Sequence, residues 1–201
     1  GLIDPKFEVL DVSADVPVEA YGQDGDGPAQ IWTDPLRMKI MAQAVCEALC
    51  ALTPEHEATY RANAEAYLAQ LDALDADIRA MVEQAEQKDV VFGGRYAMYY
   101  FFERYGLTAV SAYENCASQA EPSVRQLMDM IGEIKEKGLS VVYYEELTDP
   151  KVARTISQET GAELLLMHTC HNVSRQEWEA GETYVSLMRK NLENLKKGLG
   201  I

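Results

Sequence analysis

Two hydrophobic patterns divide this chain of 201 residues near residue 89. Before it, apolar residues recur at three- and four-residue spacing, which is typical of amphipathic helices. One such stretch begins at Asp34-Pro35, an N-cap followed by a proline at the first helical position, and continues to about Leu52. The next begins at Thr53-Pro54 and keeps its apolar spacing as far as Met81. The pattern therefore predicts two consecutive helices, of which the second forms a long strut.

After residue 89, short apolar runs alternate with helical patterns. The runs at 90–92, 109–112, 141–144 and 164–166 are typical of buried strands, and helical patterns lie near 95–105, 122–137, 149–160 and 179–197. This alternation predicts an α/β fold: a four-stranded parallel sheet with helices on both faces, joined to the long strut helix and an irregular N-terminal arm. Right-handed crossovers place all four strand exits at one edge of the sheet.

Residues 1–33 follow neither pattern. They contain a strand-like piece at 7–10 and an acidic, turn-forming segment at 23–28. We expect three parts: an N-terminal arm over 1–33, which is a remnant of a missing lobe or a linker to it; a helical strut over 34–88; and an α/β lobe over 89–201.

Composition narrows the choice of partners. An apolar content of 47% suits an ordinary globular core, and 18 Lys+Arg against 33 Asp+Glu give a formal charge of -15. Such a charge repels nucleic acid and anionic lipid and attracts cations. No apolar run approaches the roughly 20 residues that cross a bilayer. We therefore expect no nucleic-acid partner, and membrane attachment only through an anchor absent from this chain.

The rarest side chains gather at the last strand exit. His168 and His171 flank Cys170 directly after the apolar run 164–167. Ligands of open α/β sheets bind at the carboxyl ends of the strands, and imidazole and thiolate are ligands that zinc prefers. A buried thiol beside two hydrogen-bonded histidines accounts for the same cluster equally well.

The other exits offer weaker signals. Gly93-Gly94-Arg95 lacks the spacing of a phosphate-binding loop, and we expect Arg95 to pair with Glu121 or Glu145. The second exit carries Cys116 and also Glu121, which could simply cap the next helix.

The third strand exit carries two acidic residues. Glu145 and Glu146 are adjacent at a strand end, so at most one of them faces the crevice. No Ser-His-Asp arrangement is visible, and we expect no enzymatic activity.

Five blocks of sequence resemble the metal-binding lipoproteins of bacterial zinc and manganese ABC transporters. The blocks are 31–35 (Ile-Trp-Thr-Asp-Pro), 60–67, 101–107, 120–123 (Ala-Glu-Pro-Ser) and 183–188. The resemblance covers the linker helix and carboxyl-terminal lobe of that family, and residues 7–11 resemble the last strand of its amino-terminal lobe. It implies that the chain is either a fragment or a one-lobed relative.

The resemblance also implies where a metal would bind. Gln30 takes the place of a histidine before the tryptophan, and Arg95 or its neighbour takes the place of a histidine at the first exit. Gln119 falls where an acidic ligand often stands, and His168 or His171 stands at the exit where the family usually has aspartate. The three replacements bind divalent metal poorly or not at all.

A subset of such proteins is similar in combining a Gly-Gly-Arg exit, a cysteine at the second exit and a His-x-Cys-His-Asn exit. This similarity implies a rebuilt site, and two sets of residues follow from it. The expected metal ligands are His168, His171, Cys170, Cys116 and Glu121, and the residues expected to line the cleft without ligation are Gln30, Arg95 and Gln119.

The family's function becomes our first hypothesis. It is an extracytoplasmic, membrane-anchored lipoprotein that captures a divalent metal, zinc before manganese, and delivers it to an ABC transporter permease. One alternative is a metal-free interaction module derived from such a receptor, for which a homodimer of the single lobe is one arrangement. Another is a thiol redox sensor, which requires the Cα atoms of Cys116 and Cys170 to lie within about 7 Å.

Overall fold

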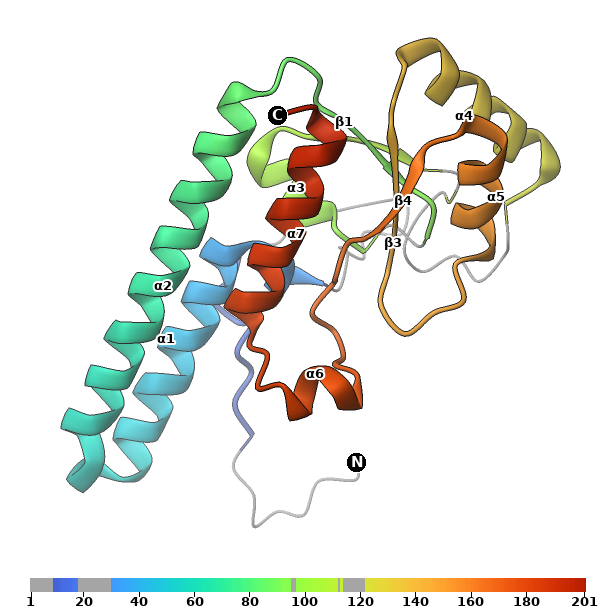
Figure 1. Cartoon of the computed structure of the whole chain (residues 1–201). Coiled ribbons are helices and arrows are strands. Elements are labelled where there is room, and N and C mark those ends of the chain that lie inside the picture. Colours follow the sequence, from blue (N-terminus) through green and yellow to red (C-terminus); the bar gives the residue numbers. More distant parts are fainter. Residues whose placement is uncertain (1–8, 18–29, 95–96, 112, 114–121) are drawn as a thin grey trace.

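The computed structural model describes residues 9–17, 30–94, 97–111, 113 and 122–201 (Figure 1). Its first large feature is a helical hairpin. Helix α1 (Pro35–Leu52) starts where the Asp34 side chain accepts a hydrogen bond from the Leu36 N–H, at 2.9 Å. A 3-10 turn at Pro54–His56 leads into α2 (Glu57–Gln84). Both predicted helices are confirmed, and Figure 1 shows them side by side.

The buried positions of α2 explain how the hairpin meets the rest of the protein. They all fall in its second half: Leu71, Leu74, Ile78, Met81 and Val82. This half packs on the α/β lobe, whereas the first half runs with α1 beyond the lobe (Figure 1). The long helix is therefore a strut, as its apolar spacing predicts.

The predicted parallel sheet is also confirmed. Strands β1 (Asp89–Phe92), β2 (Thr108–Ser111), β3 (Val141–Tyr144) and β4 (Glu163–Leu166) pair in the order β2-β1-β3-β4, and every pairing is parallel. The chain passes from β1 to β2 on one side and then returns to β3 and β4 on the other. The loops after β1 and β3 therefore diverge, which creates the switch point where ligands bind in open α/β sheets.

Alternation along the strands divides the core between the two faces of the sheet. Phe92 and Tyr143 point into the larger cluster, formed with α2, α3 (Tyr99–Tyr105) and α7 (Tyr184–Leu199). Val91 and Val142 point into a second cluster with α4 (Val124–Lys137) and α5 (Lys151–Thr160). Each large side chain buried in this way stabilises the fold by about 1.5–3 kcal/mol.

Three segments differ from their expected secondary structure. The helix expected over 179–197 is α7 and begins later, at Tyr184, because Gly181 adopts φ 72° and Thr183 starts a new capping box; the short helix α6 (Arg175–Glu179) before it was not expected. The helix expected over 95–105 begins only at Tyr99, because Ala97 and Met98 are described and not helical; residues 95–96 lie outside the described part. In the strand-like piece at 7–10, Val9 and Leu10 are exposed and not in a strand, and residues 7–8 are not described. Among the described helices, none is long and apolar enough to cross a membrane.

Candidate functional site

The carboxyl edge of the sheet is hollowed at the switch point. One cavity of about 300 Å³ lies between the β1 exit, Gly93-Gly94, and the loop after β3. A second, of about 260 Å³, is lined by the β3 exit, the β4 exit and the segment before Trp32, including Gln30, Glu145, His171 and Asn172. Glu145 and Thr148 line both, so the two cavities adjoin. Three strand exits thus open onto one polar hollow, as the topology predicts.

A glycine is required at the first exit. The Gly93 N–H donates to the Tyr143 carbonyl at 2.8 Å, which holds the turn against β3. A Cβ atom at this position would lie 2.6 Å from the Cα atom of Ala153 in α5. Close packing of the first exit on α5 therefore requires glycine at Gly93, whereas a Cβ atom at Gly94 would make only ordinary contacts, at 3.4 Å or more.

The β4 exit loop, residues 168–172, wraps around the carboxylate of Glu146. Glu146 Oε2 accepts the Thr169 N–H at 2.8 Å, and Oε1 accepts the Thr169 hydroxyl at 2.6 Å. Oε1 also receives longer hydrogen bonds from the N–H groups of His171 (3.3 Å) and Asn172 (3.5 Å). A carboxylate from one strand exit therefore shapes the backbone of the next.

The ionisation of Glu146 suits this role. Burial raises the pKa of Glu146, but the hydrogen bonds from Thr169 and the proximity of His168 outweigh burial and leave the pKa below its ordinary value of 4.5. The side chain is therefore an anion at neutral pH, and charge-assisted hydrogen bonds of this kind are stronger than neutral ones.

The two histidines of this loop point in different directions. His168 is 1% exposed, and its Nδ1 accepts the Cys170 N–H at 2.9 Å. Its Nε2 lies 3.4 Å from Oε1 of Glu177, which also caps α6 by accepting the Ser174 N–H. The Asn191 side chain accepts from the His168 N–H and donates to its carbonyl, both at 2.7 Å. His168 is thus buried and held through its backbone and Nδ1, while its Nε2 lies near Glu177 and has no hydrogen-bond partner among the described residues.

His171 is exposed and lines the smaller cavity. Its ring meets Trp32 edge to face, with 5.5 Å between the ring centroids. The Trp32 Nε1–H donates to the Thr169 carbonyl at 3.0 Å, and the Tyr184 hydroxyl donates to the Trp32 carbonyl at 2.8 Å. Trp32 therefore ties the segment carrying Gln30 to the loop carrying His171 and to α7.

Gln30 brings an unused acceptor to this cavity. Its side-chain Oε1 is buried and has no hydrogen-bond partner in the described part of the chain. Buried polar atoms are usually paired, so an orphaned carbonyl oxygen lining a polar cavity suits a ligand that accepts electron density. Gln30 lines this cavity, and its role in binding stays a prediction.

Cys170 faces the interior. It packs against the larger core cluster and adopts φ 58°, a left-handed conformation that is rare for a residue with a side chain. Burial, then the carboxylates of Glu146 and Glu177, raise its pKa to about 12. Cys170 is a free thiol, and at neutral pH it is protonated, which weakens it as a metal ligand or redox nucleophile.

The sequence-based ligand set is only partly placed by the structure. Cys116, Glu121, Arg95 and Gln119 lie outside the described residues. Among the residues that are described, no three His, Cys, Asp or Glu side chains form a group that could hold a metal ion. The five-ligand site therefore stays a prediction.

Sequence reasoning left the two roles of the third exit unassigned. Glu145 lines both cavities, whereas Glu146 reaches the smaller one and directs its oxygens to the β4 loop. Leu147 follows with φ 55° and 64% exposure. Two non-glycine residues with left-handed backbone, Leu147 and Cys170, thus flank the hollow, and such strain concentrates at functional sites. The expectation that at most one of the two glutamates faces the crevice is wrong: β3 ends at Tyr144, so strand alternation does not extend to Glu145 and Glu146, and both line the smaller cavity.

A parallel α/β lobe with a strut helix and a polar hollow at its strand exits is the architecture of ZnuA-like solute-binding domains. The chain belongs to the ZnuA family, zinc-uptake complex component A, periplasmic, whose family model matches residues 3–198. The family's description is that of a transport protein.

Characterised relatives agree with this assignment. The chain is 31% identical over 166 residues to the zinc-binding protein AdcA of Streptococcus pyogenes serotype M18, covering 83% of this chain and 32% of that protein. It is 28% identical over 169 residues to the high-affinity zinc uptake system protein ZnuA of Bacillus subtilis, covering 84% of this chain and 52% of that protein. The chain thus spans about a third to a half of the length of these relatives.

Solved structures show the same fold. The Zn(II)-bound ZnuA-like domain of Streptococcus pneumoniae AdcA superposes with a TM-score of 0.78 at 27% identity, covering 96% of this chain and 70% of that one. The laminin-binding protein Lmb of Streptococcus agalactiae, described as a bifunctional protein with adhesin and metal-transporting activity, gives 0.84 at 25% identity, covering 98% and 74%.

Proposed function

We propose that this protein is the extracytoplasmic, lipid-anchored solute-binding component of an ABC importer, and that it captures zinc at the carboxyl edge of its sheet for delivery to a permease. Family membership supports the class of function. The observation that carries the site is the shared cavity in which the exposed imidazole of His171, the partnerless oxygen of Gln30 and the side chain of Glu145 meet.

The donors around this cavity suit a divalent cation. Imidazole nitrogen is a preferred zinc ligand, carboxylate oxygen a common one, and an amide oxygen can complete a shell. The predicted ligands Cys116 and Glu121 would add a thiolate and a second carboxylate from the β2 exit. A formal charge of -15 raises the local concentration of cations around the whole surface. In this arrangement His168 does not line the cavity and instead supports the β4 exit loop from its buried side, by accepting the Cys170 N–H.

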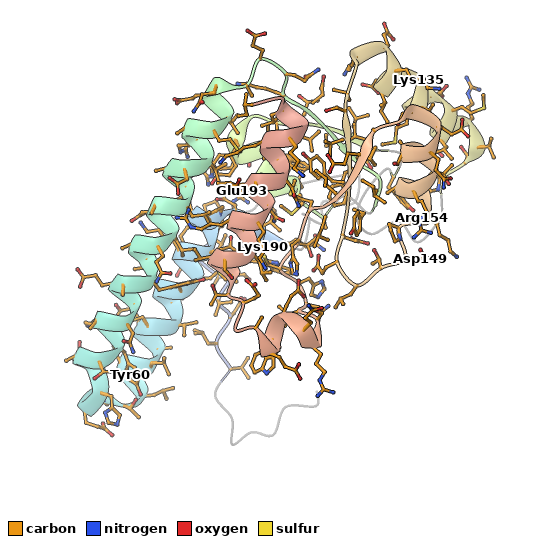
Figure 2. All side chains as sticks on the ribbon, in the orientation of Figure 1. Tyr60, Lys135, Asp149, Arg154, Lys190 and Glu193 are labelled. Carbon is orange, nitrogen blue, oxygen red and sulfur yellow. The ribbon has the colours of Figure 1, made fainter. Side chains whose placement is uncertain are left out.

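Zinc titration by calorimetry tests the proposal. His171→Ala should lower zinc affinity by at least about tenfold, because it removes the one described imidazole that lines the cavity. The matched control is His56→Ala. His56 is exposed in the turn of the hairpin and meets Tyr60 at a ring distance of 6.0 Å, at the tip remote from the sheet (Figure 2).

The outcomes separate the hypotheses. Unchanged affinity in His171→Ala, or an equal loss in His56→Ala, would contradict the site. A reduced wild-type protein that shows no zinc-binding heat would contradict the function itself and favour the metal-free interaction module. Repeating the titration with manganese decides between the two metals of the first hypothesis, and imidazole ligation favours zinc.

A further inference from the structure

The β4 exit loop is an anion-binding turn whose anion is part of the protein. The N–H groups of Thr169, His171 and Asn172 converge on the carboxylate of Glu146. Such convergence of successive N–H groups, with a left-handed residue between them, is the geometry of backbone nests that bind free anions. Here Cys170, at φ 58°, supplies the left-handed position.

Glu146 reaches this loop from a different strand. It follows β3, and the loop that it organises follows β4, some twenty-three to twenty-six residues later in the chain. The contact joins two neighbouring exits of the sheet, so it fixes where the β4 loop stands relative to the β3 exit. His171 is the member of that loop whose side chain lines the cavity.

We propose that Glu146 is a positioning residue for the cation site: it holds the backbone of His171 so that the imidazole faces the cavity, and it acts on the cation through His171. This inference rests on the proposed function. It assigns to the two adjacent glutamates of the β3 exit different tasks, with Glu145 facing the cavity and Glu146 the loop.

The hydrogen bonds of Glu146 argue against direct ligation. Its Oε2 is occupied by the Thr169 N–H, and its Oε1 takes the Thr169 hydroxyl as well as the two longer N–H bonds. Its side chain is only 7% exposed. A cation bound directly by Glu146 would have to displace these donors, and the loop would lose the contact that shapes it.

The test is a double-mutant cycle in zinc affinity, measured by calorimetry on the full chain. Glu146→Gln keeps the shape of the side chain and replaces one acceptor oxygen by an NH₂ group that cannot accept from the loop. We expect it to lower zinc affinity by about 10- to 100-fold, the usual effect of removing a residue that orients a metal ligand. In a His171→Ala background, Glu146→Gln should change zinc affinity by less than about twofold, because the imidazole through which Glu146 acts is gone.

Glu182→Gln is the matched control. Glu182 lies beyond the same loop, at the start of α7, where it accepts hydrogen bonds from Ser186 and Lys190. The substitution makes the same chemical change to a hydrogen-bonded glutamate outside the cavity lining. It should leave zinc affinity unchanged.

A measurement without metal reads the positioning directly. In the metal-free protein, Glu146→Gln should speed hydrogen exchange at the amides of Thr169, His171 and Asn172, and Glu182→Gln should not. This readout also shows whether the variant remains folded elsewhere.

Each result has one meaning. If wild type binds no zinc, the proposed function falls and the positioning role falls with it. If wild type binds zinc and His171→Ala weakens binding while Glu146→Gln does not, only the positioning role is overturned. If the losses from the two substitutions add, Glu146 is itself a ligand and the inference is wrong. If Glu146→Gln lowers the melting temperature without changing zinc affinity, its role is structural only.

Discussion

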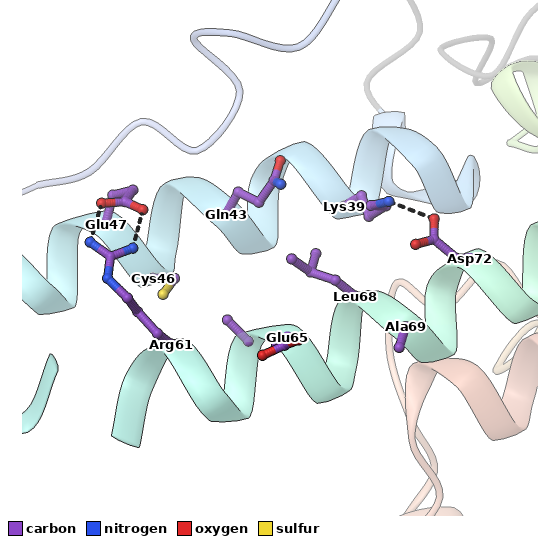
Figure 3. Close-up of a pocket in the computed structure, with 10 residues that line it drawn as sticks. Lys39, Gln43, Cys46, Glu47, Arg61, Glu65, Leu68, Ala69 and Asp72 are labelled. Carbon is purple, nitrogen blue, oxygen red and sulfur yellow. Dashed lines mark hydrogen bonds and ion pairs between the residues drawn. The ribbon is translucent and has the colours of Figure 1, made fainter. Parts of the chain in front are cut away.

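The helical hairpin and the β4 exit loop hold their charged side chains in opposite ways. In the hairpin, a groove of about 520 Å³ runs between α1 and α2, and ion pairs span it near its two ends: Arg61 with Glu47 and Lys39 with Asp72 (Figure 3). All four side chains are partly or largely exposed. In the loop, the carboxylate of Glu146 is buried and bonded mainly to backbone.

The difference decides how much each interaction matters. Exposed pairs on regular helices gain little, because water already solvates both charges well. Buried groups that accept backbone N–H bonds leave those donors unpaired when they are removed, and the cost is then large. The hairpin can therefore change its charges freely, whereas the sheet edge cannot.

The largest effect is expected where the hairpin joins the lobe. Asp34 is fully buried and accepts from Arg104, with Nε at 2.8 Å and Nη2 at 2.7 Å, while the Arg37 Nε lies 3.3 Å away. Asp34→Asn removes the counter-charge of Arg104 and leaves Arg37 with Glu103 at 3.6 Å, so it should lower the free energy of unfolding by about 3–5 kcal/mol. Asp72→Asn, in the exposed pair with Lys39, should cost about 0–1 kcal/mol. Urea denaturation measures both, and equal costs would break the comparison.

A smaller loss is expected from the amide that brackets His168. Asn191→Ala leaves the His168 N–H and carbonyl without their partner, at about 1–2 kcal/mol for each buried group, so we expect a loss of about 2–4 kcal/mol. Asn194 makes the control, since it donates only to the Leu166 carbonyl at 2.8 Å. Equal losses of unfolding free energy in Asn194→Ala and Asn191→Ala would show that the two hydrogen bonds to His168 add nothing to the cost.

Much of the fold could be predicted because it depends on local patterns. Helical spacing gave α1 and α2, and short apolar runs gave the four strands. The later start of α7, at Tyr184, was missed, although Gly181 and Thr183 carry the local signals for it. Period and capping are properties of neighbouring residues, so the sequence contains them directly.

The site could be predicted only as a neighbourhood. The sequence singles out the exit that contains His168 and His171, but it cannot say which imidazole faces the cavity. In the structure this loop contacts Glu146, from the loop after β3, and Trp32, more than a hundred residues away. Such non-local contacts leave no periodic signal. Cys170 shows the same limit, because it packs against a core cluster whose members come from distant parts of the chain.

Thiol chemistry sharpens the contrast between the inner and outer sides of the loop. Burial raises the pKa of Cys170 to about 12, so native protein at pH 8 should be alkylated at Cys170 on the order of a hundredfold or more slower than unfolded protein. Mass mapping of iodoacetamide-labelled peptides measures the two rates. Because the folded pKa of Cys170 exceeds the ordinary 9.0, the free energy of unfolding should fall as pH rises from about 9 towards 12. Rapid native labelling would place the thiol on the cavity side and revive the redox sensor.

The smallest effect is expected at Glu177, a partly exposed glutamate beside the buried His168. It caps α6 through Ser174 and lies 3.4 Å from His168, but its side chain is 22% exposed. Hydrogen bonds from Ser174 hold the pKa of Glu177 below its ordinary value of 4.5, with burial opposing them and His168 adding to them. Glu177→Gln should cost up to about 1 kcal/mol at neutral pH. Because the folded pKa is depressed, this contribution is present above pH 4.5 and is lost as pH falls through the folded value, so the two proteins should converge in acid. Denaturant unfolding between pH 7 and 3 measures the convergence, and a difference that persists at pH 3 would show that Glu177 acts by shape and not by charge.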